Sequence, residues 1–515
     1  MMEVVMKKRI ALSCIFVLIF SLAGCGQSKV ASVEQLLEEE LSGEITVSCY
    51  DPMIYKDFFE KAAKGFEEKH PGTKINVETF GKMPEIKTSE DSNSTIAIVM
   101  GSDEDNSQQT ADYIGKINTE LMGGGGPDLL VMDILPFYKY ADSGLLENLQ
   151  NYMDADKDFA KEDYRSNIIE AMKYKGGQYL MPLDYRFDYI AYDSSLLHGD
   201  DESRLKAAAD KISYHELFQI EKDSFLQENS DSSDPVRMLG MPADQVMLEE
   251  LMRCDYNEYI DFENRKVNLN DGRFASLLES VKQYGADGYL RPGTSADQLE
   301  TGDSGVPFDM SVIEKMRNEK FFFKSKSNNS LREEVLREER VKDGFQSFSF
   351  GGGITPGDEQ NDKILGLLSG HNGNKSIQYF NALGINSNSS NKALAWAFLK
   401  YLLSEEIQSD PQMMIIGLPV NNAAREELAL KIITSNYGNE ASSEAKSLTA
   451  EQEKLVKRYA DTVESLSDAL NYWPIQDDTV KEMIHKETSR FFDGSSSSGE
   501  VAEALQKKVE LYLNE

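Results

Sequence analysis

Two opposite charges flank an aromatic ring at Asp184, Tyr185 and Arg186, inside a stretch that otherwise alternates apolar and polar residues. Such alternation predicts extended chain over residues 178–192, with a reach of roughly 50 Å, which is long for one strand. A carboxylate, a phenol and a guanidinium suit the floor of a ligand-binding cleft. We therefore expect this stretch to cross between two lobes. Alternatively, Asp184 and Arg186 form an internal ion pair that locks a hinge.

Motifs that place reactive groups for common enzyme chemistry are missing from the sequence. There is no Gly-x-Ser-x-Gly, His-Glu-x-x-His or Cys-x-x-Cys, and the five histidines lack ligand spacing. A calcium-loop pattern from Asp154 fails at Phe159, where glycine is needed, and at Arg165, where glutamate is needed. The glycine run at 123–126 precedes a strand and lacks the phosphate-loop lysine. We expect no metal, no cofactor and no enzyme activity.

The first residues indicate an export signal. Lys7-Lys8-Arg9 precede an apolar run of 14 residues at 10–23, too short to span a membrane comfortably. The run ends in Leu-Ala-Gly-Cys, which resembles a bacterial lipoprotein cleavage box and implies a signal peptide at 1–24 and lipidation of Cys25. Residues 25–42 would then be the lipid anchor and tether. The alternative is an ordinary signal peptide with a chance cysteine.

Charge and cysteine content narrow the set of partners. Without residues 1–24 the chain has 54 − 3 = 51 basic and 88 − 1 = 87 acidic residues, a balance of −36. Such a chain is repelled by nucleic acid and by anionic headgroups, so no nucleic-acid partner is expected. Cys49 and Cys254 are expected to be buried small hydrophobes, with a disulfide as the alternative.

About 490 mature residues exceed what one core usually supports, which predicts two lobes. A strand at 44–49, a helix at 54–69 and a strand at 74–78 predict a parallel βαβ unit. The apolar run DLLVM at 128–132 predicts a buried strand, and the polar residues 85–112 before it predict a surface insertion. Ligands of parallel sheets lie at the carboxyl ends of strands, where Asp51 and Asp133 follow.

Five segments together resemble extracellular solute-binding proteins of family 1, the maltose-binding-protein-like lipoproteins that serve ABC importers. The segments are EKHPGTKINV at 68–77, GGPDLLVMD with SGLLENL at 125–149, YKGGQYLMPL with YDSSLL at 174–197, the asparagine-rich turn and helix at 381–408, and GLPV at 417–420. They occur in the family's order from about residue 44 to the end of the chain.

The resemblance implies an α/β, two-lobe periplasmic-binding-protein-like fold of type II. Each lobe would be a mainly parallel sheet flanked by helices, joined by hinge crossovers and closing on a ligand. Lobe 1 would comprise 43–186 plus 382–415, and lobe 2 would comprise 187–381 plus 416–515. Crossovers are expected near 184–190, 378–383 and 418–421. Residues 317–343, with the charged block LREEVLREERVKD, predict an added helix that the family core does not require.

Sugar sites combine flat aromatic faces with carboxylates and amides. Trp473 lies in a loop before Pro474, where the resemblance implies a stacking aromatic, and Tyr472 is the second choice. Trp396 is expected to pack in the core of its helix. The other implied ligand contacts come from both lobes and the crossover: Asp51, Asp133, Asp184, Tyr185, Arg186, Asp244, Gln245 and Asp309.

We therefore expect a monomeric, lipid-anchored receptor on the outer face of the bacterial cytoplasmic membrane, on a Gram-positive surface. It would bind a small solute, a sugar or oligosaccharide, and deliver it to the transmembrane subunits of an ABC permease. One alternative is a ligand sensor that signals to a membrane kinase. Another is a surface glycoside hydrolase, for which Asp477-Asp478 beside Trp473 is the best carboxylate pair, although adjacent acids at a helix start are better explained as caps.

Overall fold

The computed structural model describes residues 32–38, 40–50, 52–81, 103–231, 236–292, 320–331, 361–379, 381–410, 417–435 and 449–514. Residues 1–40 and 41–515 form separate compact units. In the first unit, α2 (Val33–Leu37) begins with a capping box formed by Ser32 and Gln35. The predicted leader and Cys25 lie outside the described residues, as do Asp51 and Asp309.

The first sheet has the strand order β2-β1-β3-β12-β4. Its strands are β1 (Gly43–Cys49), β2 (Thr73–Thr79), β3 (Leu129–Val131), β4 (Met181–Pro182) and β12 (Ala382–Ile385). The predicted βαβ unit is confirmed, because β1 and β2 are parallel and α3 (Pro52–Lys69) connects them. The predicted buried strand is also confirmed, since β3 is fully buried and runs parallel to β1. In contrast, β12 is antiparallel to both of its neighbours.

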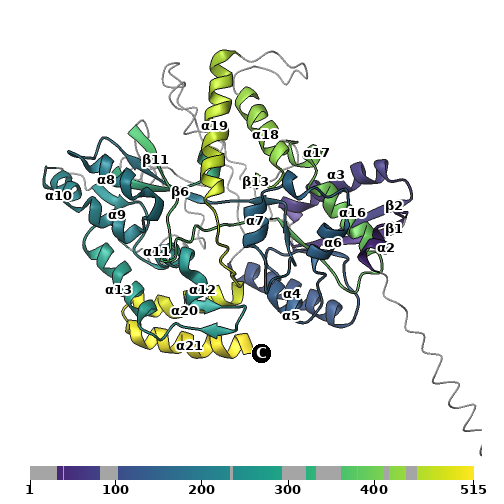
Figure 1. Cartoon of the computed structure of the whole chain (residues 1–515). Helices are drawn as coiled ribbons and strands as arrows, with labels where there is room; N and C mark the ends of the chain where they lie inside the picture. Colours follow the sequence, from purple (N-terminus) through teal and green to yellow (C-terminus); the bar gives the residue numbers. More distant parts are fainter. Residues whose placement is uncertain are drawn as a thin grey trace, which may run out of the picture. The chain divides into compact units, whose positions relative to one another are not determined.

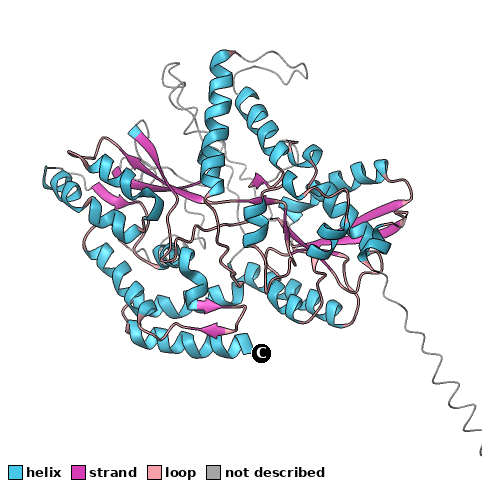
Figure 2. Cartoon of the chain, in the orientation of Figure 1, coloured by secondary structure: helices cyan, strands magenta, loops and turns pink. Residues whose placement is uncertain are grey.

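The second sheet has the order β11-β6-β10-β7. Its strands are β6 (Asp188–Asp193), β7 (Val236–Leu239), β10 (Lys320–Ser327) and β11 (Asp362–Gly366). Only the β10–β7 pair among these is parallel. We call the parts built around the first and second sheets the first and second lobes. Two lobes with α/β sheets are thus confirmed, but the sheets are mixed rather than mainly parallel (Figure 2).

The predicted added helix at 317–343 is wrong in its first part. Residues 320–327 form β10, an interior strand of the second sheet whose Phe321, Phe322 and Phe323 are buried. The aromatic run packs well on a pleated surface, and this tertiary context outweighs the helical charge pattern that follows. Residues 332–343 lie outside the described residues.

Helices cover both sheets (Figure 1). In the first lobe α16 (Lys392–Leu402) packs against α3, β1 and β12. The helices of this lobe are α4 (Asp103–Met122), α5 (Phe137–Asp142), α6 (Leu149–Ala155), α7 (Ser166–Ala171), α16 (Lys392–Leu402) and α17 (Glu405–Gln408). The predicted insertion at 85–112 is described only from residue 103, where α4 begins.

The second lobe contains a cluster in which α20 (Asp478–Phe492) and α21 (Ser498–Asn514) pack against each other and against α13 (Arg273–Ala286) (Figure 1). Its elements are α8 (Asp201–Ala208), α9 (Tyr214–Ile220), α10 (Lys222–Asp231), α11 (Gln245–Met252), α12 (Tyr256–Tyr259), β8 (Ile260–Asp261), β9 (Lys266–Val267), α13 (Arg273–Ala286), α20 (Asp478–Phe492) and α21 (Ser498–Asn514). Two further helices, α18 (Asn422–Ser435) and α19 (Ala450–Asp468), pack against each other.

The stretch 178–192 leads from one sheet to the other, as predicted. It contributes β4 to the first sheet, β5 (Asp184–Tyr185) to a pair with β13 (Leu418–Pro419), and β6 to the second sheet. Backbone hydrogen bonds join Arg186 to Gln378, and Ile377 donates to the carbonyl of Tyr472 at 2.8 Å. Four chain segments are therefore bonded side by side where the chain passes between the lobes.

Both cysteines of the described residues are thiols, and no disulfide joins them. Cys49 is buried at the end of β1, as predicted, and Cys254 is partly exposed. Burial raises the pKa of Cys254 to about 12, so it is a weak nucleophile.

Candidate functional site

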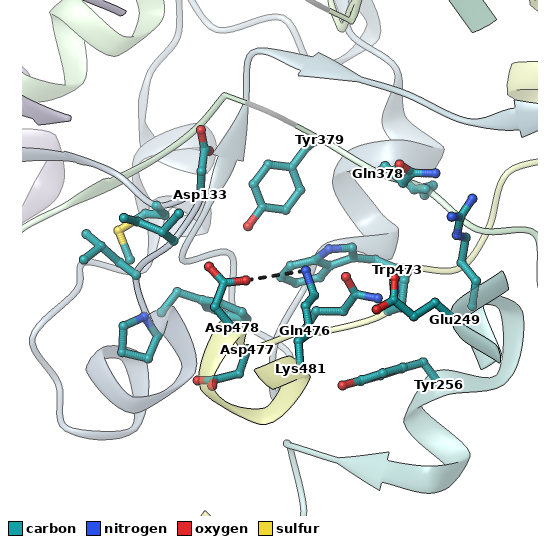
Figure 3. A pocket seen from close by; sticks show the side chains of 18 of the residues that line it. Asp133, Glu249, Tyr256, Gln378, Tyr379, Trp473, Gln476, Asp477, Asp478 and Lys481 are labelled. Atoms are coloured by element: carbon teal, nitrogen blue, oxygen red, sulfur yellow. Dashed lines mark ion pairs between the residues drawn. The ribbon is translucent and has the colours of Figure 1, made fainter. Parts of the chain in front are cut away.

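A cavity of about 320 Å³ lies between the segment that follows β3 and the helices α11, α12 and α20 (Figure 3). The crossover segment at 377–379 lines it as well. The lining residues are Met132, Asp133, Ile134, Leu135, Pro136, Phe137, Glu249, Met252, Arg253, Tyr256, Ile377, Gln378, Tyr379, Trp473, Pro474, Gln476, Asp477, Asp478, Lys481 and Ile484. Aromatic rings and carboxylates thus reach one space from both lobes.

Trp473 lies in an aromatic cluster on the cavity wall. Its ring centroid is 5.1 Å from that of Phe137 and 5.8 Å from that of Tyr379. The chain before it is fixed, because the amide of Asn257 donates to the Tyr472 hydroxyl at 2.7 Å. Tyr472 does not line the cavity, so it positions the loop that presents Trp473. These rings offer apolar faces of the kind that pack on a pyranose.

Asp133 is the acidic group on the wall from the first lobe. Tyr55 donates a hydrogen bond to Oδ2, and the amide of Ala382 donates to Oδ1 at 3.4 Å. Burial raises the pKa of Asp133 to about 8 and the nearby Asp184 adds to the rise, although the Tyr55 hydrogen bond opposes it. At neutral pH this carboxyl is therefore mostly protonated and can donate a hydrogen bond to a ligand.

The wall from the second lobe includes the start of α20. Asp477 is the N-cap of this helix, since its Oδ1 accepts from the Val480 amide at 3.1 Å. Its Oδ2 accepts from the hydroxyls of Tyr138 and Tyr512, each at 3.0 Å. The capping role expected for this acid is confirmed, and its lone pairs are largely used. Asp478 instead faces Lys481, with 3.5 Å between Oδ1 and Nζ (Figure 3).

Arg253 connects the cavity wall to the crossover. Its guanidinium forms ion pairs with Asp188, at the start of β6, and with Glu250 of α11. Gln378, from the other crossover segment, donates to the same Asp188 carboxylate at 2.8 Å. Burial raises the pKa of Glu250 to about 7, with Arg253 opposing the rise. The charge of Arg253 is thus already matched within the protein.

The predicted ligand residues fall into three groups. Asp133 and Trp473 line the cavity. Asp184, Tyr185 and Arg186 lie at the crossover behind it: Asp184 is fully buried and accepts from Asn381 at 2.5 Å, and Tyr185 donates to Ser467 at 2.9 Å. The structure does not bring these three side chains to the cavity lining.

Asp244 and Gln245 belong to the third group, away from the cavity. Asp244 caps α11 by accepting from the Val246 amide at 2.9 Å, and Gln245 donates to Ser489 of α20 at 2.7 Å. Their helix does reach the cavity, but one turn later, through Glu249. Asp51 and Asp309 lie outside the described residues.

Sequence reasoning missed Glu249, Tyr256 and Tyr379. Tyr379 had an available signal, because it directly follows Gln378 in the predicted crossover. Tyr256 and Glu249 carried no local signal, since their position depends on how α11 and α12 pack. Within the described part of the chain, no cluster of His, Cys, Asp and Glu could hold a metal ion. The described helices likewise include none that is long and apolar enough to cross a membrane.

Comparison with known families gives a match to bacterial extracellular solute-binding proteins over residues 104–441, about two thirds of the chain. The chain belongs to this family. No sequence among curated proteins matches it. The family assignment agrees with the predicted resemblance and places the protein among binding proteins that act outside the cytoplasm.

Solved structures of this solute-binding class share the fold. The sugar-binding protein MalE from Xanthomonas citri is 15% identical with a TM-score of 0.55, covering 92% of this chain and 98% of its own. An extracellular solute-binding protein family 1 member from Alicyclobacillus acidocaldarius is 14% identical with a TM-score of 0.54, covering 93% and 100%. An ABC substrate-binding protein from Listeria monocytogenes, in complex with cycloalternan, is 16% identical with a TM-score of 0.50, covering 92% and 100%. These likenesses establish the fold.

Proposed function

We propose that the protein is a lipid-anchored receptor that captures a sugar or short oligosaccharide and delivers it to an ABC permease. The observation that carries the proposal is the cavity in which Trp473, Phe137 and Tyr379 meet carboxyl groups from both lobes. Aromatic faces with a few polar groups are the composition that sugars require. Structural neighbours described as sugar-binding or as complexed with cycloalternan point in the same direction.

The charges around the cavity favour an uncharged ligand over an anion. Four carboxyl groups line it, namely Asp133, Glu249, Asp477 and Asp478, against two cations, Arg253 and Lys481. Both cations already face carboxylates. An acidic sugar or phosphorylated ligand would meet no uncommitted cation on the described walls. Sugar hydroxyls, in contrast, would find acceptors there.

The proposal includes the division of the chain and its place in the cell. Residues 1–24 would be removed, Cys25 lipidated and 26–42 kept as a tether; lobe 1 would comprise 43–186 plus 382–415, and lobe 2 the rest. Hinge closure about the crossovers would then trap the ligand. The receptor would act as a monomer on the outer face of the cytoplasmic membrane. Cys25→Ala should release the protein into the medium, whereas continued membrane attachment would rule out the anchor.

The decisive experiment is a binding screen of residues 26–515. Thermal shift and calorimetry would cover glucose, maltose, maltotriose, trehalose, cellobiose and raffinose, with amino acids and polyamines as controls. A ligand at a hundred times its dissociation constant stabilises the folded protein by about 2.7 kcal/mol, which is a visible shift. Binding of one sugar series supports the proposal. A shift only with a control compound, or with none of the sugars, would reject the sugar assignment.

A further inference from the structure

Tyr256, the first residue of α12, is a buried tyrosine whose hydroxyl has no protein partner. The residue is 4% exposed, and its hydroxyl oxygen forms no hydrogen bond with any described residue. The same residue lines the cavity. An unpaired buried hydroxyl costs stability, so such a group calls for an explanation.

Neighbouring buried tyrosines show that the fold can satisfy this kind of group. Tyr138 donates to Asp477 at 3.0 Å, Tyr214 to Glu250 at 3.2 Å and Tyr185 to Ser467 at 2.9 Å. The Tyr472 hydroxyl accepts from the Asn257 amide, one residue along the chain from Tyr256. Tyr256 therefore differs from these four tyrosines, whose hydroxyls all have a protein partner.

The surroundings of Tyr256 keep its hydroxyl protonated. Burial raises its pKa well above the usual value, and the charges of Asp477 and Glu249 add to the rise. Figure 3 shows the hydroxyl end of Tyr256 turned toward the side of Asp477, whose carboxylate already accepts three hydrogen bonds. The proton of Tyr256 is thus available to an acceptor that enters the cavity.

Glu249 supplies the complementary group. It is exposed on α11 and lines the same cavity, and its side-chain carboxylate forms no hydrogen bond or ion pair with another described residue. Tyr256 can donate and Glu249 can accept, so a ligand that offers both an acceptor and a donor oxygen suits the chemistry of this pair. Neighbouring sugar hydroxyls have this pattern. A carboxylate or phosphate could accept from Tyr256 but would be repelled by Glu249.

We propose, building on the sugar-binding function above, that Tyr256 is a specificity-determining residue that donates a hydrogen bond to a hydroxyl oxygen of the bound sugar. The site then requires a hydroxyl at one ring position and discriminates against the analogue that lacks it. A site built to bond a hydroxyl rejects such an analogue strongly, because its own polar group is left unpaired.

The test introduces Tyr256→Phe into residues 26–515, which keep the tether but lack the proposed lipidated Cys25. The probe is the sugar from the screen that binds the wild type most tightly, together with its monodeoxy analogues. The variant should bind the parent sugar at least about tenfold more weakly, while its ligand-free melting temperature is unchanged or higher. One deoxy analogue should bind the wild type at least about tenfold less tightly than the parent, and the variant should not distinguish the two.

A matched control is Tyr152→Phe in α6. Tyr152 is fully buried, donates to Glu147 at 3.3 Å and does not line the cavity. This change should lower the melting temperature and leave affinity intact.

Three different results would contradict three different parts of the proposal. A lower melting temperature for ligand-free Tyr256→Phe would show that the hydroxyl is already bonded in the unliganded protein, and this result needs no ligand. Equal sugar affinity of wild type and variant would overturn the specificity role while leaving the receptor function intact. A wild type that binds no sugar would instead overturn the proposed function.

Discussion

Each of the two tryptophans of the chain lies among aromatic rings and near an aspartate, but one is packed in the protein interior and the other lies on the cavity wall. Trp396 packs against Tyr152 and Phe159, and its indole N–H donates to Asp156 at 2.8 Å. Trp473 lies against Phe137 and Tyr379 on the cavity wall, where Asp133 is also found. Around Trp396 the polar groups form hydrogen bonds with each other inside the protein. Around Trp473 the side chains line a cavity that a ligand can fill.

Asp156, beside Trp396, and Asp133, on the cavity wall, differ in the direction in which their pKa is shifted. Burial alone would raise the pKa of Asp156, yet hydrogen bonds from Lys400 and Trp396 bring it below its usual value. Burial and the nearby Asp184 together raise the pKa of Asp133 to about 8 against the opposing Tyr55 hydrogen bond, and no cation is among the groups that shift it. Hydrogen bonds in the interior therefore keep Asp156 ionised, whereas Asp133 on the cavity wall loses its proton only near pH 8.

The largest expected effects are those of replacing each tryptophan by alanine, which should lower sugar affinity in one case and stability in the other. Trp473→Ala removes the apolar face and should weaken sugar binding at least about 100-fold, as expected for a central aromatic contact. Trp396→Ala should lower the free energy of unfolding by about 3–5 kcal/mol through the cavity it leaves. Its affinity for the same sugar should change less than about threefold.

Calorimetry and chemical denaturation on both variants would measure this contrast, with circular dichroism to establish that each is folded during titration. A large affinity loss in Trp396→Ala, or none in Trp473→Ala, would contradict the assignment of the two regions.

The aspartates should show opposite pH dependence. Asp133 has a folded pKa of about 8 against roughly 3.9 unfolded, so the folded state holds the extra proton between these values. Its contribution to stability is present at low pH and is lost as pH rises toward 8, by at most about 1.4 kcal/mol per pH unit. Asp156 has a lowered folded pKa, so its contribution is present above pH 4 and is lost at more acid pH.

Denaturation curves at pH 4, 7 and 9 would test the pair. Asp133→Asn keeps an uncharged group of the same shape and should flatten the loss of stability between pH 4 and 8, making the variant the more stable protein at pH 9. Asp156→Asn should cost about 1.5–3 kcal/mol at pH 7, because two charge-assisted hydrogen bonds weaken. If Asp133→Asn destabilised the protein at pH 9, the carboxylate would have to be compensated there.

The same contrast explains what could be predicted from the sequence. Local periodicity was enough for the βαβ unit, for β3 and for the crossing stretch at 178–192, because pleating and amphipathic faces are written in neighbouring residues. Trp473 was predicted to contact the ligand from its place in a loop before Pro474, where the resemblance implies a stacking aromatic. Asp133 was predicted to contact it from its place after a buried strand. The structure places both in the cavity lining, and their ligand contact stays a prediction.

The predictions that failed concern features that depend on helix packing angles and on contacts between distant segments of the chain. Asp244 and Gln245 were predicted to contact the ligand, but they cap and brace α11 while Glu249, on its next turn, reaches the cavity. Tyr256 belongs to the four-residue helix α12, too short to show a periodic pattern. The strand β10 was misassigned because the charged block after it has a strong helical pattern, whereas its pairing with β6 and β7 is non-local.

Glu221 tests the limit of the comparison, because it is a buried acid that lies away from the cavity. It is fully buried, and neither carboxylate oxygen forms a hydrogen bond with a described residue. Burial and the nearby Asp201 together raise its pKa to about 7, although Arg204 opposes the rise. Since the folded pKa exceeds the unfolded value, stability is lost as pH rises from about 4.5 to 7.

Glu221→Gln should therefore stabilise the protein at pH 8 by about 1–3 kcal/mol, match it at pH 4, and leave sugar affinity unchanged. Denaturation at the two pH values and one calorimetric titration would measure this. A gain without loss of binding would mean that an unpaired buried group marks a ligand site only when it also borders a cavity, as Tyr256 does. A loss of affinity would mean instead that the interior of the second lobe is coupled to closure, because Glu221 does not line the cavity.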